Sequence, residues 1–371
     1  MIKYRFILLV IFLSMAGTVH GGPQENVDEH LEDTRQGGEV IPAKGNFVAV
    51  PIPISNPTVG TGLQAALLYL HPKEENSQSK NSTSGIAGMY TDSNSWLAGI
   101  FHDGYWANET YKFTGYLGGG ELNLKYYGIG DDPVLSDNPI DYKLTTFTFS
   151  PRLLRRIPST EYWYAGIHYL FIHTDTILET SELNPGLPDF EEKIRTAGFG
   201  LIATYDSRDD NYYPVKGQRF QAMWTNYGEI WGGDLEYNKF TTFINHYQPI
   251  MDKTVLALRC NFQASEGGTP YFDLPYLDIR GVSRSRYKDH FTLSVHAEGR
   301  YKFRPRWGMV AFVEAGWFAE DIGSLTSSLT IVSYGGGLRW QVTKEKKLNL
   351  GLDYAISTDD EAFLIRIGEK F

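Results

Sequence analysis

The side chains that could carry catalytic or metal chemistry are scattered along this sequence. The histidines lack metal-ligand spacing, and no Ser, His and Asp set is arranged as a catalytic triad. Cys260 is the only cysteine, so an intrachain disulfide is excluded, and we assign this thiol no nucleophilic role. These observations predict neither an enzyme nor a bound metal or cofactor.

One dense group of charges precedes a Pro-x-x-Gly stretch: Asp206, Arg208, Asp209 and Asp210. A cation site is one interpretation of this group. A hydrogen-bonded turn explains it better, because hard cations need six or more arranged oxygen ligands.

The chemistry that the charges support best is ion pairing inside a strand-built lumen. Glu298 and Arg300 belong to a run in which Thr, Ser, His, Glu and Arg alternate with Phe291, Leu293, Val295 and Ala297. A period of two puts each set on its own face of a strand. The polar face meets bulk water in a soluble sandwich or a wet lumen in a transmembrane barrel. In a lumen, Glu298 would need a cationic partner.

Similar alternating runs cover the chain from Phe47 to its end. The final run, FLIRIGEKF, puts Phe363, Ile365, Ile367, Glu369 and Phe371 on one parity. We expect about sixteen strands, an even number as in bacterial single-chain barrels. They are placed at 47–56, 60–71, 83–92, 95–105, 110–126, 141–153, 160–177, 193–206, 217–228, 235–249, 253–265, 291–303, 307–318, 330–342, 347–356 and 361–371.

The connections between these runs alternate in length. Most turns on one side are short, whereas the other side receives longer loops at 128–140, 180–192, 266–290 and 320–328. Long external loops and short periplasmic turns are typical of outer-membrane barrels. The 206–217 turn is unusually long for the short side. After residue 16 no apolar run approaches the roughly 18 residues of a membrane-spanning helix, so any crossing is made by strands.

The N-terminus predicts export. Lys3 and Arg5 precede a short apolar core and small residues, which indicates a signal peptide over 1–22 with cleavage between Gly17 and Gly22. Residues 23–45 are polar and acidic, so we expect a flexible or plug-like segment before a barrel domain at 46–371. The net charge of −10 argues against nucleic acid as a partner. The fold class predicted is therefore all-β, a transmembrane antiparallel barrel in the bacterial outer membrane.

Three motifs in the final two-thirds of the chain resemble the bacterial surface antigen family, the barrel of the BamA/TamA assembly factors and two-partner secretion transporters. They are Ile279-Arg280-Gly281 followed by Arg286-Tyr287, the FVEAG stretch Phe312 to Gly316, and YDSRDD…P..G from Tyr205 to Gly217. Two positions depart from the family pattern: Val282 replaces an aromatic residue, which Tyr287 could supply, and Glu314 replaces Asp. The chain looks like a short member without POTRA domains.

The resemblance implies a loop folded into the lumen between strands eleven and twelve. Arg280 would lie inside, where Glu314, placed inward by the family motif, or Glu298 could pair with it. The pair is either a latch whose release opens the barrel or a static strut that keeps the lumen filled. Asp206, Arg208 and Asp209 would form the family's long turn. Phe363, Ile365, Ile367 and Phe371 look like the C-terminal signal that barrel-assembly machinery recognises.

The resemblance also implies a non-enzymatic activity, the translocation or insertion of a protein or lipid at the outer membrane. The alternatives are a passive or structural pore and a surface-exposed binding protein. Expected partners are outer-membrane lipid and lipopolysaccharide, the barrel-assembly machinery, an unidentified protein or lipid substrate, and further copies of the chain. Pro51 and Pro53 could weaken the closing seam at the first strand, or pairing could begin at the second strand.

Overall fold

The structure is a computed structural model of the chain, and it describes residues 46–72, 82–130, 135, 137–183, 188–341, 348–358 and 360–371. The predicted signal peptide and the 23–45 segment lie outside the described residues. No helix in the described part of the chain is long and apolar enough to span a membrane.

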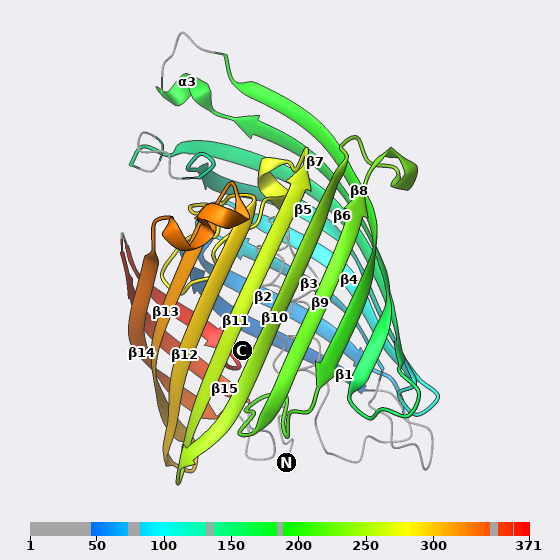
Figure 1. Cartoon of the computed structure of the whole chain (residues 1–371), viewed down its shortest axis with the longest axis vertical. Coiled ribbons are helices and arrows are strands. Elements are labelled where there is room, and N and C mark those ends of the chain that lie inside the picture. The colour runs from blue at the N-terminus through cyan, green and yellow to red at the C-terminus, as the bar shows by residue number, and fades with distance from the viewer. Residues whose placement is uncertain are drawn as a thin grey trace.

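Sixteen strands among the described residues close into one antiparallel barrel (Figure 1), as the alternating runs predict. Each strand pairs with its sequence neighbours, and β16 returns to β1. The strands are β1 (Asn46–Asn56), β2 (Gly60–Leu70), β3 (Thr83–Thr91), β4 (Trp96–Trp106), β5 (Tyr111–Tyr126), β6 (Ile140–Arg156), β7 (Trp163–Leu178), β8 (Phe190–Asp206), β9 (Gly217–Tyr227), β10 (Tyr237–Met251), β11 (Thr254–Gly267), β12 (Phe291–Arg304), β13 (Trp307–Ala319), β14 (Ile331–Gln341), β15 (Asn349–Ser357) and β16 (Glu361–Ile367). In the connections that the structure describes, four short helical elements occur: α3 (Thr180–Leu183), η1 (Glu229–Trp231), η2 (Tyr271–Asp273) and η3 (Ile322–Ser327).

The two faces of the barrel wall differ as the period-two pattern requires. On β12, Ser294, His296 and Glu298 are buried in the lumen, while Val295 between them is exposed on the outer face. On β2, Leu63 and Leu67 are likewise exposed outside. Exposed apolar side chains on the outer face are suited to lipid. The polar residues of the pattern are therefore concentrated inside.

The connections divide by length between the two ends of the barrel. The β10–β11 and β12–β13 turns at the lower end of Figure 1 are short, and the segments that carry α3, η1 and η3 lie at the upper end. This division identifies the lower end as periplasmic. The 207–216 turn is the long periplasmic connection expected from the sequence.

The seam between β1 and β16 is much shorter than the other ladders. β1 pairs with β2 along its whole length, from Asn46↔Leu70 to Asn56↔Gly60. Toward β16, the described residues give one aligned pair, Ser55↔Ile365. The first strand therefore belongs to the barrel, which contradicts the alternative in which pairing begins at the second strand.

The last strand ends earlier than the sequence pattern suggested. β16 stops at Ile367, and Gly368 adopts a φ of 82°, in the left-handed region that glycine tolerates. The chain then turns into the lumen, so that Phe371 is buried at 2% exposure. The expectation of a strand running to Phe371 was wrong, because the positive φ at Gly368 breaks the alternation.

The segment between β11 and β12, residues 268–290, is folded inside the barrel, and we call it the lumen loop. Its two arms approach each other at an antiparallel bridge between Tyr276 and Lys288. Leu277, Ile279 and Tyr287 are buried among apolar side chains that include Phe318 of β13 and Ile331 of β14. The loop thus packs against the wall formed by the C-terminal half of the barrel.

Candidate functional site

The lumen loop is anchored near its start by a buried carboxylate. Asp273, in η2, accepts hydrogen bonds from the Lys239 ammonium at 2.7 Å and from the Tyr237 hydroxyl at 2.7 Å. Lys239 also donates to the backbone carbonyl of Asp273 at 2.6 Å. All three side chains are buried, so the charges satisfy each other away from solvent. These hydrogen bonds fix the first arm of the lumen loop, which follows β11, to β10.

Further along the loop, Arg280 meets two lumen carboxylates. Its Nε donates to Glu314 Oε1 and its Nη1 to Glu298 Oε2, both at 2.6 Å. Its backbone N–H donates to Glu314 Oε2 at 2.6 Å, and Ser333 donates to its carbonyl at 2.7 Å. Arg280, Glu298 and Glu314 are each no more than 3% exposed. We call these three residues the latch; their bonds to side chain and backbone pin the loop to β12 and β13.

An aromatic ring completes the environment of the latch guanidinium. The Arg280 Cζ lies 3.4 Å from the ring centroid of Phe312, which is buried on β13. A cation over a desolvated ring is attracted to its negative face. Gly281 follows with a φ of 81°, and a Cβ there would lie 3.1 Å from the Ala355 Cβ. Glycine therefore lets the loop turn close to β15.

The latch belongs to a larger buried network of charges on β12 to β16. Glu298 also accepts from Arg300 Nε at 2.7 Å. Asp353 forms ion pairs with Arg339 and, at 3.1 Å, with Arg366, and lies 3.5 Å from Arg280. Each carboxylate thus faces at least two cations, which offsets the cost of burying it.

The C-terminal tail contributes to the same network. Glu369 accepts from Arg339 Nε at 2.8 Å, and Arg300 Nη2 donates to the Phe371 carbonyl at 2.5 Å. Lys370 donates to the Asp278 carbonyl oxygen of the lumen loop at 2.8 Å. Burial disfavours the Asp278 carboxylate, but the nearby Lys370 and Arg284 hold its pKa below the ordinary value. The tail, the loop and the wall are therefore joined electrostatically.

The remaining loop residues expected from the sequence have packing roles. Tyr287 stacks at a tilt on Phe318, with ring centroids 5.2 Å apart, and lies in the same apolar cluster as Ile279 and Val282. The Arg286 guanidinium lies 5.5 Å from the Tyr127 ring centroid. Tyr287 therefore provides an aromatic group beside Val282.

The predicted long turn is held by its own carboxylates. Arg208 donates through Nε to Asp206 Oδ1 at 3.0 Å, and its side chain is buried. Asp209 Oδ1 accepts from the backbone N–H groups of Val215 and Lys216, at 2.9 and 3.1 Å. These bonds support the turn interpretation. Among the described residues, no group of three or more His, Cys, Asp or Glu side chains is placed to hold a metal ion.

The four residues proposed as a C-terminal signal are divided between two environments. Phe363 is 64% exposed on the outer face of β16, and Ile365 is aligned with Ser55 at the seam. Ile367 and Phe371 are buried. The four side chains therefore do not form one lipid-facing row.

Sequence reasoning missed several members of the network, chiefly Asp273, Arg339, Asp353 and Lys370. Asp353 could have been noticed, because it alternates with Leu352 and Tyr354 and so has lumen parity. Its partners come from three other segments, and their closeness depends on strand register, which alternation alone does not supply.

Comparisons with known proteins agree with this geometry. A family model described as the Omp85 superfamily domain matches residues 101–371. Among curated proteins, none matches the sequence.

Several solved structures share the fold. BamA from Haemophilus ducreyi lacking POTRA domains 1–3 is similar with a TM-score of 0.58 and 13% identity, over 87% of this chain and 69% of that one. CdiB from Escherichia coli gives a TM-score of 0.61 and 11% identity, over 89% of this chain and 63% of that one. CdiB from Acinetobacter baumannii gives 0.56 and 12%, over 88% and 60%. The chain thus spans less than two thirds of either CdiB chain, and identities this low show the fold alone.

Proposed function

The chain belongs to the Omp85 superfamily, and from this we propose that its barrel inserts a protein or lipid substrate into the outer membrane or moves it across. The protein lies in the bacterial outer membrane. The activity we propose is non-enzymatic and uses the lumen and the β1–β16 seam. The observation that carries the proposal is the combination of a loop latched inside the lumen with a seam that has one aligned residue pair.

The lumen loop contacts the hairpin whose first strand forms the seam, which gives a route for coupling the loop to the seam. The backbone N–H of Arg284, in the lumen loop, donates to Thr58 Oγ1 in the β1–β2 turn at 3.1 Å. Release of the latch would therefore remove a contact that holds the first hairpin. Pro51 and Pro53 have equal parity on β1 and no N–H to donate, so one of the two ladders of β1 lacks these donors.

The proposal includes the partners of the barrel. Its exposed apolar outer face suits membrane lipid. Lipopolysaccharide bridged by divalent ions would suit the exposed acidic residues Glu320, Asp321, Asp360 and Glu361. Barrel-assembly machinery would insert the protein itself, with Phe363 the most exposed residue of the terminal signal. The substrate is a protein or a lipid, and association of several copies is compatible with the same activity.

Photo-crosslinking in cells tests the seam as the working site. A photoreactive amino acid replaces Phe363, which is 64% exposed at the seam, or Leu201, which is 56% exposed on the outer face of β8. An insertase or translocase should give adducts with outer-membrane proteins or lipids at position 363 that position 201 does not give. Identical adducts at both positions would contradict the proposal and favour a passive pore.

A further inference from the structure

A cavity of about 400 Å³ lies at the extracellular end of the barrel, opposite the periplasmic turns. The β1–β2 turn lines one side of it with Thr58, and β5 and β6 line another with Leu124 and Tyr142. The lumen loop lines the remaining side with Ser283 and Ser285. Cavities that bind small molecules usually measure about 300–1,000 Å³. This cavity is therefore large enough for a small organic ligand.

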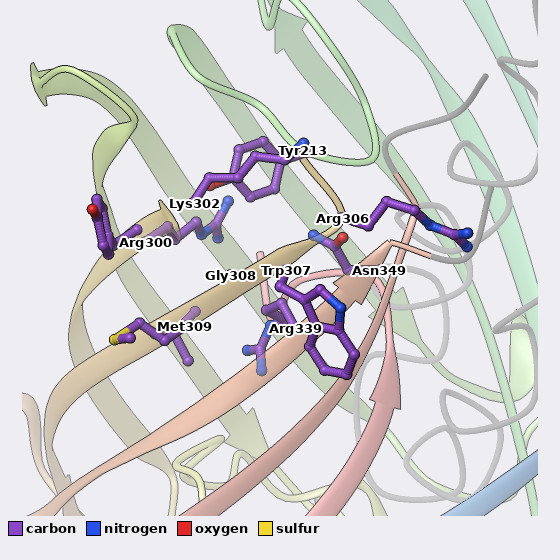
Figure 2. A pocket seen from close by; sticks show the side chains of 11 residues that line it. Tyr213, Arg300, Lys302, Arg306, Trp307, Gly308, Met309, Arg339 and Asn349 are labelled. Atoms are coloured by element: carbon purple, nitrogen blue, oxygen red, sulfur yellow. The ribbon is translucent and has the colours of Figure 1, made fainter. Parts of the chain in front are cut away.

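A second cavity differs sharply in size (Figure 2). It lies at the periplasmic ends of β12 to β14, and its enclosed part measures about 10 Å³, which is room for one water molecule. Arg300 and Arg339 line it, and they are already paired with Glu298 and Glu369. That cavity is part of the charge network and is too small for an organic ligand.

The floor of the extracellular cavity is apolar. Val59, Leu124 and Tyr142 line it, and each is no more than 3% exposed. All three belong to one cluster of packed apolar side chains, so the floor is formed before any ligand arrives. An apolar floor with a few polar groups around it suits a ligand that has both a hydrocarbon face and polar substituents.

The rim of this cavity carries polar groups that the protein leaves open. Asn123, Lys125 and Asp141 line it, and no hydrogen bond or ion pair joins their side chains to other described residues. The lining has one cation, Lys125, against the carboxylates of Asp141 and Glu179, so it does not favour an anionic ligand. Uncharged hydroxyl groups, in contrast, can donate to a carboxylate and accept from an ammonium or an amide.

The edge of β5 adds a backbone donor and a backbone acceptor. β5 pairs with β4 only as far as Glu121, and the Ser95 hydroxyl then bonds the N–H and the C=O of Asn123, at 2.9 and 3.4 Å. Lys125 faces the same side, because alternate residues of a strand do, and its backbone has no such partner among the described residues. Since β5 ends at Tyr126, the open edge is one residue long. It is too short for an added strand and suits a small ligand.

We propose that this cavity binds a saccharide of about one or two rings at the cell surface. One face of a sugar ring lies on Leu124 and Tyr142, and its hydroxyls bond Asp141, Asn123 and the backbone of Lys125. The core of lipopolysaccharide and free saccharides share this chemistry, and the test below separates them. The inference does not depend on the proposed translocation activity.

Protection of an introduced thiol tests the site. In the refolded Cys260→Ser protein in detergent, Ser93→Cys places a thiol in the lining of the cavity, where a maleimide labels it. Ser328→Cys is the matched control outside the cavity. Both serines are half-buried at the extracellular end, and their hydroxyls donate to the backbone carbonyls of Val59 and Leu325 respectively. The probes are maltose, the lipid-free core oligosaccharide of lipopolysaccharide and the tripeptide Gly-Ser-Gly.

A bound sugar should slow the labelling of Ser93→Cys several-fold and saturably, and should leave the labelling of Ser328→Cys unchanged. Adding Asp141→Ala should weaken the sugar's affinity about tenfold, because hydrogen bonds to charged groups are the stronger class. Adding Asp321→Ala, which removes an exposed carboxylate outside the cavity, should not. Protection by the core oligosaccharide alone would identify lipopolysaccharide as the source, and protection by maltose would identify free saccharides.

The proposal would be overturned by a lack of protection from either sugar, by equal slowing at both thiols, or by equal protection from the tripeptide. Undiminished affinity in the Asp141→Ala protein would also contradict it. Gel mobility with and without heating verifies that each variant is folded.

Discussion

At the scale of single residues, the latch is a set of ion pairs that differs from ordinary surface pairs in being buried. Arg280 uses its side chain and backbone against Glu314 and Glu298, and none of the three is accessible to water. Removing one partner leaves a buried charge without compensation. We propose that such a group serves either as a strut that keeps the lumen filled or as a latch whose release moves the loop.

We predict that Arg280→Ala destabilises the refolded barrel by about 3–5 kcal/mol, the usual cost of breaking a buried pair from one side. Arg284→Ala is the control, because its pair with Asp278 at 3.2 Å is partly exposed and should contribute no more than about 1 kcal/mol. Urea unfolding followed by tryptophan fluorescence measures both.

The double variant Arg280→Ala/Glu314→Ala should be less destabilised than the sum of its single variants, by about 0.5–3 kcal/mol. Additive losses would show that the two side chains act independently, contrary to the hydrogen bonds between them.

At the scale of elements, the seam is the part of the barrel with the least backbone pairing. β5 pairs with β6 from Tyr111↔Arg155 to Tyr126↔Ile140, whereas β1 meets β16 at Ser55↔Ile365. Short ladders open at a lower free energy than long ones. The seam should therefore be the first place at which the wall opens.

Hydrogen exchange followed by mass spectrometry should show faster exchange in β1 and β16 than in β5 and β6. In a Cys260→Ser background, oxidised Ser55→Cys/Ile365→Cys should slow exchange at the seam. The control Ser55→Cys/Thr61→Cys joins β1 to β2, which are already paired, and should leave exchange in β16 unchanged. Equal protection of all four strands in the uncrosslinked protein would contradict a weak seam.

The element scale also shows where sequence patterns suffice. The alternation of β12 predicted that Glu298 and Arg300 face inward, because side-chain direction in a strand follows the period of two. The same rule failed at Phe371, since the positive φ of Gly368 ends the alternation. Any glycine can adopt a positive φ, so the local sequence does not show at which glycine the strand ends.

At the scale of the whole molecule, the barrel and its lumen loop were predictable, but the charge network was only partly so. The Arg280–Glu314 contact followed from motifs that resemble a known family. Asp353 and Arg339 come from neighbouring strands, and Lys370 from a tail whose inward turn the sequence did not indicate. The register between strands and the inward turn of the tail bring these three side chains close together. That convergence joins the loop and the tail to the wall of the barrel.

Closure of the lumen by the latched loop is tested most directly by the single-channel conductance of the refolded barrel in planar bilayers. The proteins compared are the wild type, Arg280→Ala and the Arg284→Ala control. A lumen closed by a latched loop predicts a nearly silent wild type and control, and frequent openings for Arg280→Ala. A wild type that is open and unaffected by Arg280→Ala would contradict the latch and identify the barrel as a passive pore.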